Sequence, residues 1–166
     1  MTTKNSTLVA NFEASPNKMS KVHQLGGRQR VISGTVALAT TDLEAADILM
    51  VAPISTAASV VSIVLWNDDL DSGTTNTADV GLYTTGGTAV DDDCYASAIT
   101  DLRAAVGGAG TEVAFEARNI NTMGQQVWED AGQSSDPGGL YYIALTFDAA
   151  GNTAGELSWK ITYVVD

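Results

Sequence analysis

The fold of this chain is constrained most by a series of short apolar segments, each about as long as a β-strand and each bounded by turn-forming residues. In the clearest of them, 156–166, the apolar and aromatic residues at odd-numbered positions from Leu157 to Tyr163 alternate with polar or charged residues such as Lys160. This period of two is typical of an antiparallel strand with one buried face. In 58–66 both alternating sets are largely apolar, which predicts a strand in the middle of a sheet.

Further segments predict strands by the same reasoning. They are residues 30–40, 47–53, 78–84, 88–90, 111–117 and 140–148. The chain has 16 glycines and only 3 prolines, and clusters of Gly, Asp, Asn and Thr separate the segments, as turns between strands require. Two paired sheets bury such strands, so we predict a mainly β fold, an antiparallel β-sandwich of the class that includes the jelly roll.

Two segments have apolar residues at helical spacing. In 93–106 a capping Asp93 and a terminating Gly107-Gly108 flank the apolar residues Ala96, Ile99 and Leu102. In 122–131 the apolar residues include Met123 and Val127, which are one helical turn apart. One or two short helices are therefore predicted beside the strands.

Residues 1–29 have a weaker core pattern and predict an extended N-terminal arm, which leaves 30–166 as the sandwich domain. Within the arm, the alternation around Leu8, Ala10 and Phe12 favours a short strand. Pro16 would end that strand, and Gly26-Gly27 would bend the chain.

The charge of the chain is divided between these two parts. Residues 1–35 contain five Lys and Arg residues and one Glu, a net charge of +4, whereas residues 36–166 contain three cations and 19 carboxylates, a net charge of −16. A basic arm is attracted to its own body, to a neighbouring copy or to another acidic surface, so the division points to assembly. The candidate contact residues in the arm and just beyond it are Lys18, Lys21, Arg28 and Arg30.

Composition argues against several other roles. A sequence pI near 4.1 argues against nucleic acid as a partner, because phosphate binding needs clustered cations. No apolar run approaches the roughly 20 residues that span a bilayer, and the N-terminus lacks the apolar region of a secretory signal, so we expect no membrane partner and no leader. Cys94 and His23 are each the only residue of their type, so we expect no disulfide, no Cys/His zinc site and no cofactor.

One loop has the spacing of calcium ligands, with oxygen-bearing side chains at Asn67, Asp69 and Asp71. An EF-hand loop needs glycine at its sixth position and glutamate at its twelfth, where this chain has Ser72 and Ala78. The loop is therefore interpreted as a solvated acidic turn, and the three residues are kept as the alternative, a metal site. The run from Asp91 to Asp93 is the other dense acidic stretch. Asp93 is interpreted as the N-cap of the helix predicted at 93–106, and Asp91 and Asp92 are left open between a solvated turn and a site for calcium or for the basic arm of another copy.

No arrangement of catalytic residues stands out. The chain has no G-x-S-x-G motif, and the neighbouring carboxylates of Glu112 and Glu116 lie in no predicted cleft. Three aspartates precede Cys94 and oppose formation of its thiolate. We therefore predict that the protein is not an enzyme.

Several stretches carry a resemblance when they are taken together. They are LVANFEASP (8–16), GTVALATTDL (34–43), and residues 48–73, 80–100, 113–132 and 134–166. In the texture and order of these segments, the chain resembles a group of small virion proteins encoded by tailed phages, especially phages of aquatic bacteria. The resemblance covers most of the chain and includes no invariant motif.

The resemblance implies a structural, decoration or cement protein, with a β-sandwich or jelly-roll fold, that sits on the outer capsid shell, often as a trimer. It carries over no catalytic or ligand residues. We therefore expect a virion protein, assembled in the host cytoplasm, whose arm contacts the major capsid protein or a neighbouring copy. The alternative is a tail- or fibre-associated sandwich that binds host glycans through exposed aromatic residues, namely Trp66, Trp128 and Tyr141.

Overall fold

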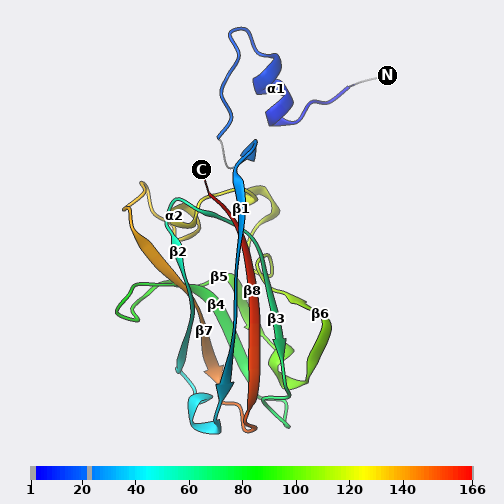
Figure 1. Cartoon of the computed structure of the whole chain (residues 1–166), viewed down its shortest axis with the longest axis vertical. Helices are drawn as coiled ribbons and strands as arrows, with labels where there is room; N and C mark the ends of the chain where they lie inside the picture. Colours follow the sequence, from blue (N-terminus) through cyan, green and yellow to red (C-terminus); the bar gives the residue numbers. More distant parts are fainter. Residues whose placement is uncertain (1–2, 22–23, 166) are drawn as a thin grey trace.

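The computed structural model describes residues 3–21 and 24–165. Two four-stranded antiparallel sheets face each other, and a segment with one short helix extends from one end (Figure 1). The first sheet contains, in spatial order, β1 (Arg28–Leu38), β8 (Gly155–Val165), β3 (Ser59–Asn67) and β6 (Val106–Glu112). The second contains β2 (Ile48–Ser55), β7 (Leu140–Ala149), β4 (Thr77–Tyr83) and β5 (Ala89–Ile99). The predicted β-sandwich is confirmed.

The strand order is that of a jelly roll. β4 pairs with β5, β3 with β6, β2 with β7 and β1 with β8, so the chain forms one long antiparallel ribbon folded back at the β4–β5 turn. Pairing of β3 with β8 and of β4 with β7 then rolls this ribbon into two sheets. Nested pairing of this kind defines the jelly-roll sandwich.

The alternation predicted for 156–166 is present in β8, where Leu157 and Ile161 are fully buried and Lys160 is exposed. β3 is an interior strand, as its two apolar faces predicted. A bulge between Val60 and Ser62 changes its alternation, so that Val60 is buried and Val61 is 44% exposed. The core between the sheets is made of inward residues from both sheets, with β2 and β5 contributing as well as β3, β4, β7 and β8.

The helix predicted at 93–106 is wrong. β5 continues to Ile99, and only a 3-10 turn, Asp101–Arg103, follows. In β5, Ala96 and Ile99 lie opposite Val80 and Ala78 of β4, so three residues of one strand match two of the other. Because of this bulge, Ala96 and Ile99 both point into the core although they are three positions apart. A spacing of three between buried residues also occurs in a helix, which is why the segment resembled one.

Other boundaries also differ from prediction. Residues 7–13 form helix α1 (Thr7–Glu13) instead of a strand, and the side chain of Ser6 accepts a hydrogen bond from the Val9 N–H at its start. The strand predicted at 111–117 lies earlier, as β6, with Gly108 and Gly110 at positive φ. A Cβ on Gly110 would lie 2.4 Å from the Val64 side chain, so only glycine lets β6 approach β3 there. The helix predicted at 122–131 is present but shorter, as α2 (Val127–Asp130).

Cys94 is largely buried and packs against the core, as expected of a structural cysteine. Burial raises the pKa of its thiol, and nearby carboxylates such as Asp91 add to that effect. No helix in the described ranges has the length and apolar composition that crossing a membrane requires.

Candidate functional site

The most distinctive part of the molecule is the end of the sandwich from which the N-terminal segment extends (Figure 1). We call this the arm-bearing end, made by residues 3–21, 24–27, 56–61 and 113–139. The opposite end, made by residues 39–47, 68–76, 100–105 and 150–154, is called the far end. The long connection 113–139 between β6 and β7 forms most of the surface beneath the arm.

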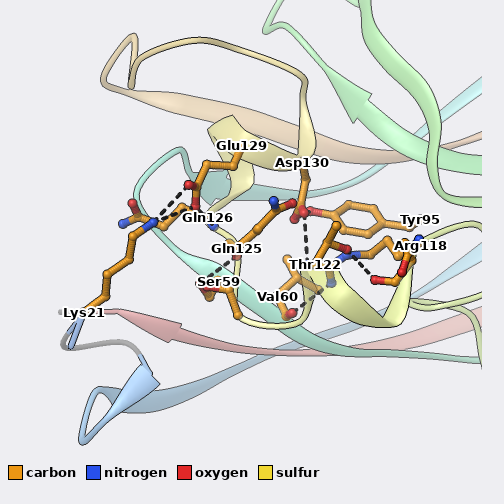
Figure 2. A network of polar contacts seen from close by, with 12 residues as sticks. Lys21, Ser59, Val60, Tyr95, Arg118, Thr122, Gln125, Gln126, Glu129 and Asp130 are labelled. Carbon is orange, nitrogen blue, oxygen red and sulfur yellow. Dashed lines mark hydrogen bonds and ion pairs between the residues drawn. The ribbon is translucent and has the colours of Figure 1, made fainter. Parts of the chain in front are cut away.

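One predicted arm residue contacts the body. The Nζ atom of Lys21 lies 3.0 Å from Oε1 and 3.1 Å from Oε2 of Glu129 in α2 (Figure 2). Glu129 also accepts a hydrogen bond of 2.8 Å from the Gln126 N–H and so caps the start of α2. The Lys21 side chain is half exposed, so this pair ties the base of the arm to α2 without burying it.

A buried ion pair joins the last residue of α2 to the loop before it. The guanidinium of Arg118 donates to Oδ1 of Asp130 at 3.0 Å and to the Val60 carbonyl at 3.1 Å (Figure 2). The rings of Tyr95 and Phe115 lie 5.3 and 4.8 Å from the guanidinium carbon, and the Tyr95 hydroxyl donates to Asp130. This clasp joins the 113–126 loop and α2 to β3 and β5.

The charge of Asp130 depends on this clasp. Burial raises the pKa of its carboxyl to about 6, although the charge of Arg118 and the hydrogen bonds from Tyr95 and Arg118 oppose the shift. The two side chains of the pair are only 3% and 2% exposed, so removal of either partner would leave a buried charge.

Backbone contacts complete the attachment of this end. The Val127 N–H donates to the Ala58 carbonyl at 2.7 Å, and the Trp128 N–H donates to the Thr56 carbonyl at 3.1 Å. The Ser59 hydroxyl donates to the Gln125 carbonyl at 2.7 Å (Figure 2). The turn between β2 and β3 is thereby joined to the start of α2, and the arm-bearing end has a fixed shape.

A groove of about 610 Å³ lies at this end, between α1 and the sandwich. Its lining is mainly apolar and includes Val60, Val61, Phe115, Met123 and Val164, with Thr7 and Leu8 of α1 at one side. Phe115 also stacks on Arg118, so the buried clasp fixes the wall of the groove.

Most of the large apolar side chains that are exposed in the described residues belong to the arm-bearing end. They are Leu8, Val9, Phe12, Met19 and Leu25 in the N-terminal segment, and Val61, Ile120 and Met123 on the sandwich. Exposed apolar patches are a common feature of interaction surfaces, so this end is the candidate site.

The remaining predicted contact residues do not form one cluster with Lys21. Lys18 is exposed in the segment between α1 and Lys21. Arg28 and Arg30 are exposed at the start of β1, where they pair with Val165 and Tyr163 of β8. All four cations therefore lie at or near the arm-bearing end, but on different elements.

In the loop considered for calcium, residues 67–76, carboxylate oxygens accept hydrogen bonds from the backbone of the loop itself. The Asp71 carboxylate accepts hydrogen bonds from the N–H groups of Gly73, Thr75 and Asn76 at 3.1, 2.9 and 2.9 Å. These bonds, foremost that from Asn76, lower the pKa of Asp71 although burial opposes them. The Asn67 amide donates to the Ala104 carbonyl, and Asp69 accepts from the Asp71 N–H. The loop uses these side chains to hold its own conformation.

Another acidic group lies in β5. Among the residues that the structure describes, Asp91, Asp92 and Asp93 form a group whose carboxylate oxygens lie within 4.8 Å of one another. Burial and the neighbouring Asp93 raise the pKa of Asp91. Asp93 lies within a strand and caps no helix, which corrects its predicted role. His23 lies outside the described residues.

The three aromatic residues considered for glycan binding lie apart. Trp66 is near the far end of β3, where Nζ of Lys160 lies 5.6 Å from the centroid of its ring. Trp128 is in α2, and Tyr141 is at the start of β7 and packs against the core. They therefore do not form a single platform.

These features define a jelly-roll sandwich with an N-terminal extension. No protein-family model matches the chain, and no curated protein matches it. Among solved structures, it is similar to a chain of the capsid asymmetric unit of cyanophage Pam1, with 20% identity, a TM-score of 0.57 and complete coverage of both chains. It is also similar to a chain of the capsid of Ralstonia phage GP4, with 19% identity, a TM-score of 0.55, and coverage of 90% of this chain and 92% of the other. These likenesses show a shared fold.

Proposed function

We propose that this protein is a non-enzymatic structural protein of a phage virion, of the decoration or cement type, which binds the outer surface of the capsid. The observation that carries the proposal is the arm-bearing end, where exposed apolar side chains and basic residues extend from a rigid, acidic sandwich. Two similar structures come from phage capsids; one matches this chain over its full length and the other over 90% of it.

The chemistry of the two ends supports an orientation on the shell. Exposed Lys18, Arg28 and Arg30 would meet carboxylates of the major capsid protein or of a neighbouring copy, with the arm-bearing end toward the shell. The protein would act as a homo-oligomer, a trimer, added to the virion in the host cytoplasm. A shell repeats each contact many times, so modest contacts add up to stable attachment.

Deletion of residues 1–27 tests this proposal, because it removes the N-terminal segment and leaves β1 complete. The shortened protein should keep the circular dichroism spectrum of a β-sandwich and fail to copurify with capsids that were assembled without the full-length protein. A control is Thr41→Ala, which changes one exposed side chain at the far end. If the shortened protein loads onto capsids as well as the intact chain does, the arm-bearing end is not the attachment site.

A second candidate, a tail- or fibre-associated sandwich that binds glycans, is favoured by one observation. A shallow depression on the outer face of the first sheet is lined by Trp66, Lys160 and the hydroxyls of Ser33, Thr35 and Ser158. An aromatic ring beside hydroxyls and a cation suits an acidic sugar. Binding on a glycan array that is abolished by Lys160→Ala would support this function, whereas a blank array would remove it.

A further inference from the structure

Helix α1 presents apolar side chains that its own body does not cover. Leu8, Val9 and Phe12 are 37%, 43% and 72% exposed, and none of the seven residues of α1 is buried. Isolated helices shorter than about 12–15 residues are marginal in water, and most helices are stabilised by packing of an apolar face. The exposed face of α1 therefore lacks the packing that a helix of this length needs.

The arm-bearing end has a groove with an apolar lining, which could receive the apolar face of α1. Its volume of about 610 Å³ lies in the range of preformed binding pockets, and Val60, Val61, Phe115 and Met123 give it an apolar lining. Met123 is 67% exposed and Val61 is 44% exposed, so the groove is open to an incoming side chain. In the single chain only Thr7 and Leu8 of α1 reach it, and Phe12 is not among the residues that line it.

We propose that α1 of one copy packs into the groove of a second copy, with Phe12 as the inserted side chain. The proposal deepens the proposed function by naming a partner for the arm-bearing end, and the partner is this same chain. Exchange of an identical element between subunits is an economical route to an oligomer, because every contact already exists in the sequence.

The charge distribution of the chain favours a second copy of the chain as the partner that fills the groove. Residues 1–35 carry a net charge of +4, and residues 36–166 carry −16, so each copy presents a basic segment to the acidic body of another. Glu116, which follows Phe115 of the groove wall, is exposed. Lys4 and Lys18 flank α1 in the sequence and would add electrostatic attraction to the apolar contact.

The connection to α1 has enough length for the exchange. Lys21 is held at α2 by its ion pair, and residues 14–20 lie between that point and α1. Seven residues span at most about 25 Å when extended. A reciprocal exchange between two copies closes a dimer, whereas a head-to-tail exchange whose rotation closes gives a ring such as a trimer.

Cross-linking of mixed variants tests the exchange directly. Phe12→Cys and Met123→Cys proteins of different tagged mass are mixed at high concentration, without capsids, and treated with a short bismaleimide. Exchange predicts a cross-linked pair that contains one chain of each variant. The Met19→Cys protein, changed at a 95% exposed position of the same segment, should give a much weaker product with Met123→Cys. Cys94 is largely buried with a raised pKa, so the parent protein should remain uncross-linked.

The double variant Phe12→Cys/Met123→Cys separates the two possible pairings. Covalent oligomers support exchange, whereas a product that stays monomeric shows that α1 packs on its own chain and overturns the proposal. Light scattering of Phe12→Glu gives an independent measurement, with dissociation to monomers expected and the circular dichroism spectrum unchanged. A parent protein that is monomeric at every concentration also overturns the exchange. If that monomer still loads onto capsids, the exchange fails while the proposed decoration role stands.

Discussion

The two ends of the sandwich differ in whether their loops bury their own apolar side chains or leave them exposed. At the far end, Leu43 and Leu70 are fully buried, and the Leu70 N–H donates to the Leu102 carbonyl while its own carbonyl accepts from Asn152. The arm-bearing end is equally well fixed by the Arg118 clasp, yet it leaves Phe12, Ile120 and Met123 exposed. One end thus completes its own packing, and the other leaves apolar side chains exposed on a well-held surface.

The carboxylates of the two ends have different roles as a result. At the far end, Asp71 is buried and accepts backbone hydrogen bonds, so its charge stabilises a loop. At the arm-bearing end, Asp130 holds Arg118 below the surface while Glu129 holds Lys21 at the surface. Three of the substitutions below, Arg118→Met, Asp71→Ala and Lys21→Met, each alter one of these carboxylate contacts.

The largest effect is expected from Arg118→Met. Because the substitution leaves the buried Asp130 without its partner, it should lower the free energy of unfolding by about 3–5 kcal/mol, measured by urea denaturation. The double variant Arg118→Met/Asp130→Leu should recover much of the loss, because it removes both charges. An unchanged midpoint for Arg118→Met would mean that the clasp does not fix the arm-bearing end.

The next effect is expected at the far end, from Asp71→Ala. Removal of the carboxylate leaves the N–H groups of Gly73, Thr75 and Asn76 without their acceptor, so the denaturation midpoint should fall. Asp71→Asn keeps one acceptor oxygen and should lose less. Addition of calcium should not restore the midpoint of Asp71→Ala, and a calcium-dependent midpoint of the parent protein would contradict the interpretation of this loop as self-bonded.

The fold was predictable because alternation and turn residues are local features of the sequence. Strands β3, β7 and β8 follow directly from their patterns. The helix predicted at 93–106 failed because a bulge in β5 imitates helical spacing, and bulges depend on the partner strand. Helix α1 was missed because residues 8–13 alternate like a strand, while Ser6, a good N-cap, was the overlooked signal.

The candidate site was predictable only in part. The charge division predicted an arm that contacts an acidic surface, and Lys21 forms an ion pair with Glu129 of the same chain. The Arg118–Asp130 pair was not found, because its members are twelve positions apart and no motif links them. A usable signal was that Arg118 is one of only three cations in residues 36–166. The groove required α1, β3, β8 and the loop before α2 to meet, which sequence order does not reveal.

A moderate effect is expected from pH. The pKa of Asp130 is raised to about 6, and those of Asp91 and Asp148 are raised by burial and by neighbouring carboxylates. A carboxyl with a raised folded-state pKa binds its proton more tightly in the folded protein, so stability rises as pH falls from about 7 toward the unfolded value of 3.8. Below that value the lowered pKa of Asp71 acts in the opposite direction, and stability should fall.

Urea midpoints measured from pH 7.5 to 3 check this dependence. Asp148→Asn removes one carboxyl whose pKa is raised by burial and by the neighbouring Asp79, so the gain in stability on lowering the pH should be smaller. Asp136→Asn, at an exposed turn of the arm-bearing end, serves as the matched control and should leave the slope unchanged. A midpoint that falls steadily from pH 7 to 5 would show that the raised carboxyls do not govern stability.

The smallest effect is expected from Lys21→Met. Lys21 pairs with Glu129 and Arg118 pairs with Asp130, and both carboxylates lie on α2, but only the Lys21 pair is exposed. An ion pair whose lysine is half exposed contributes about 0–1 kcal/mol, so the urea midpoint should barely change. Deletion of residues 1–27 should be similarly mild, because no residue of α1 is buried against the sandwich. A loss as large as that of Arg118→Met would make the N-terminal segment part of the folded core. A small loss joined to weaker capsid loading would instead separate the role of this segment from the stability of the sandwich.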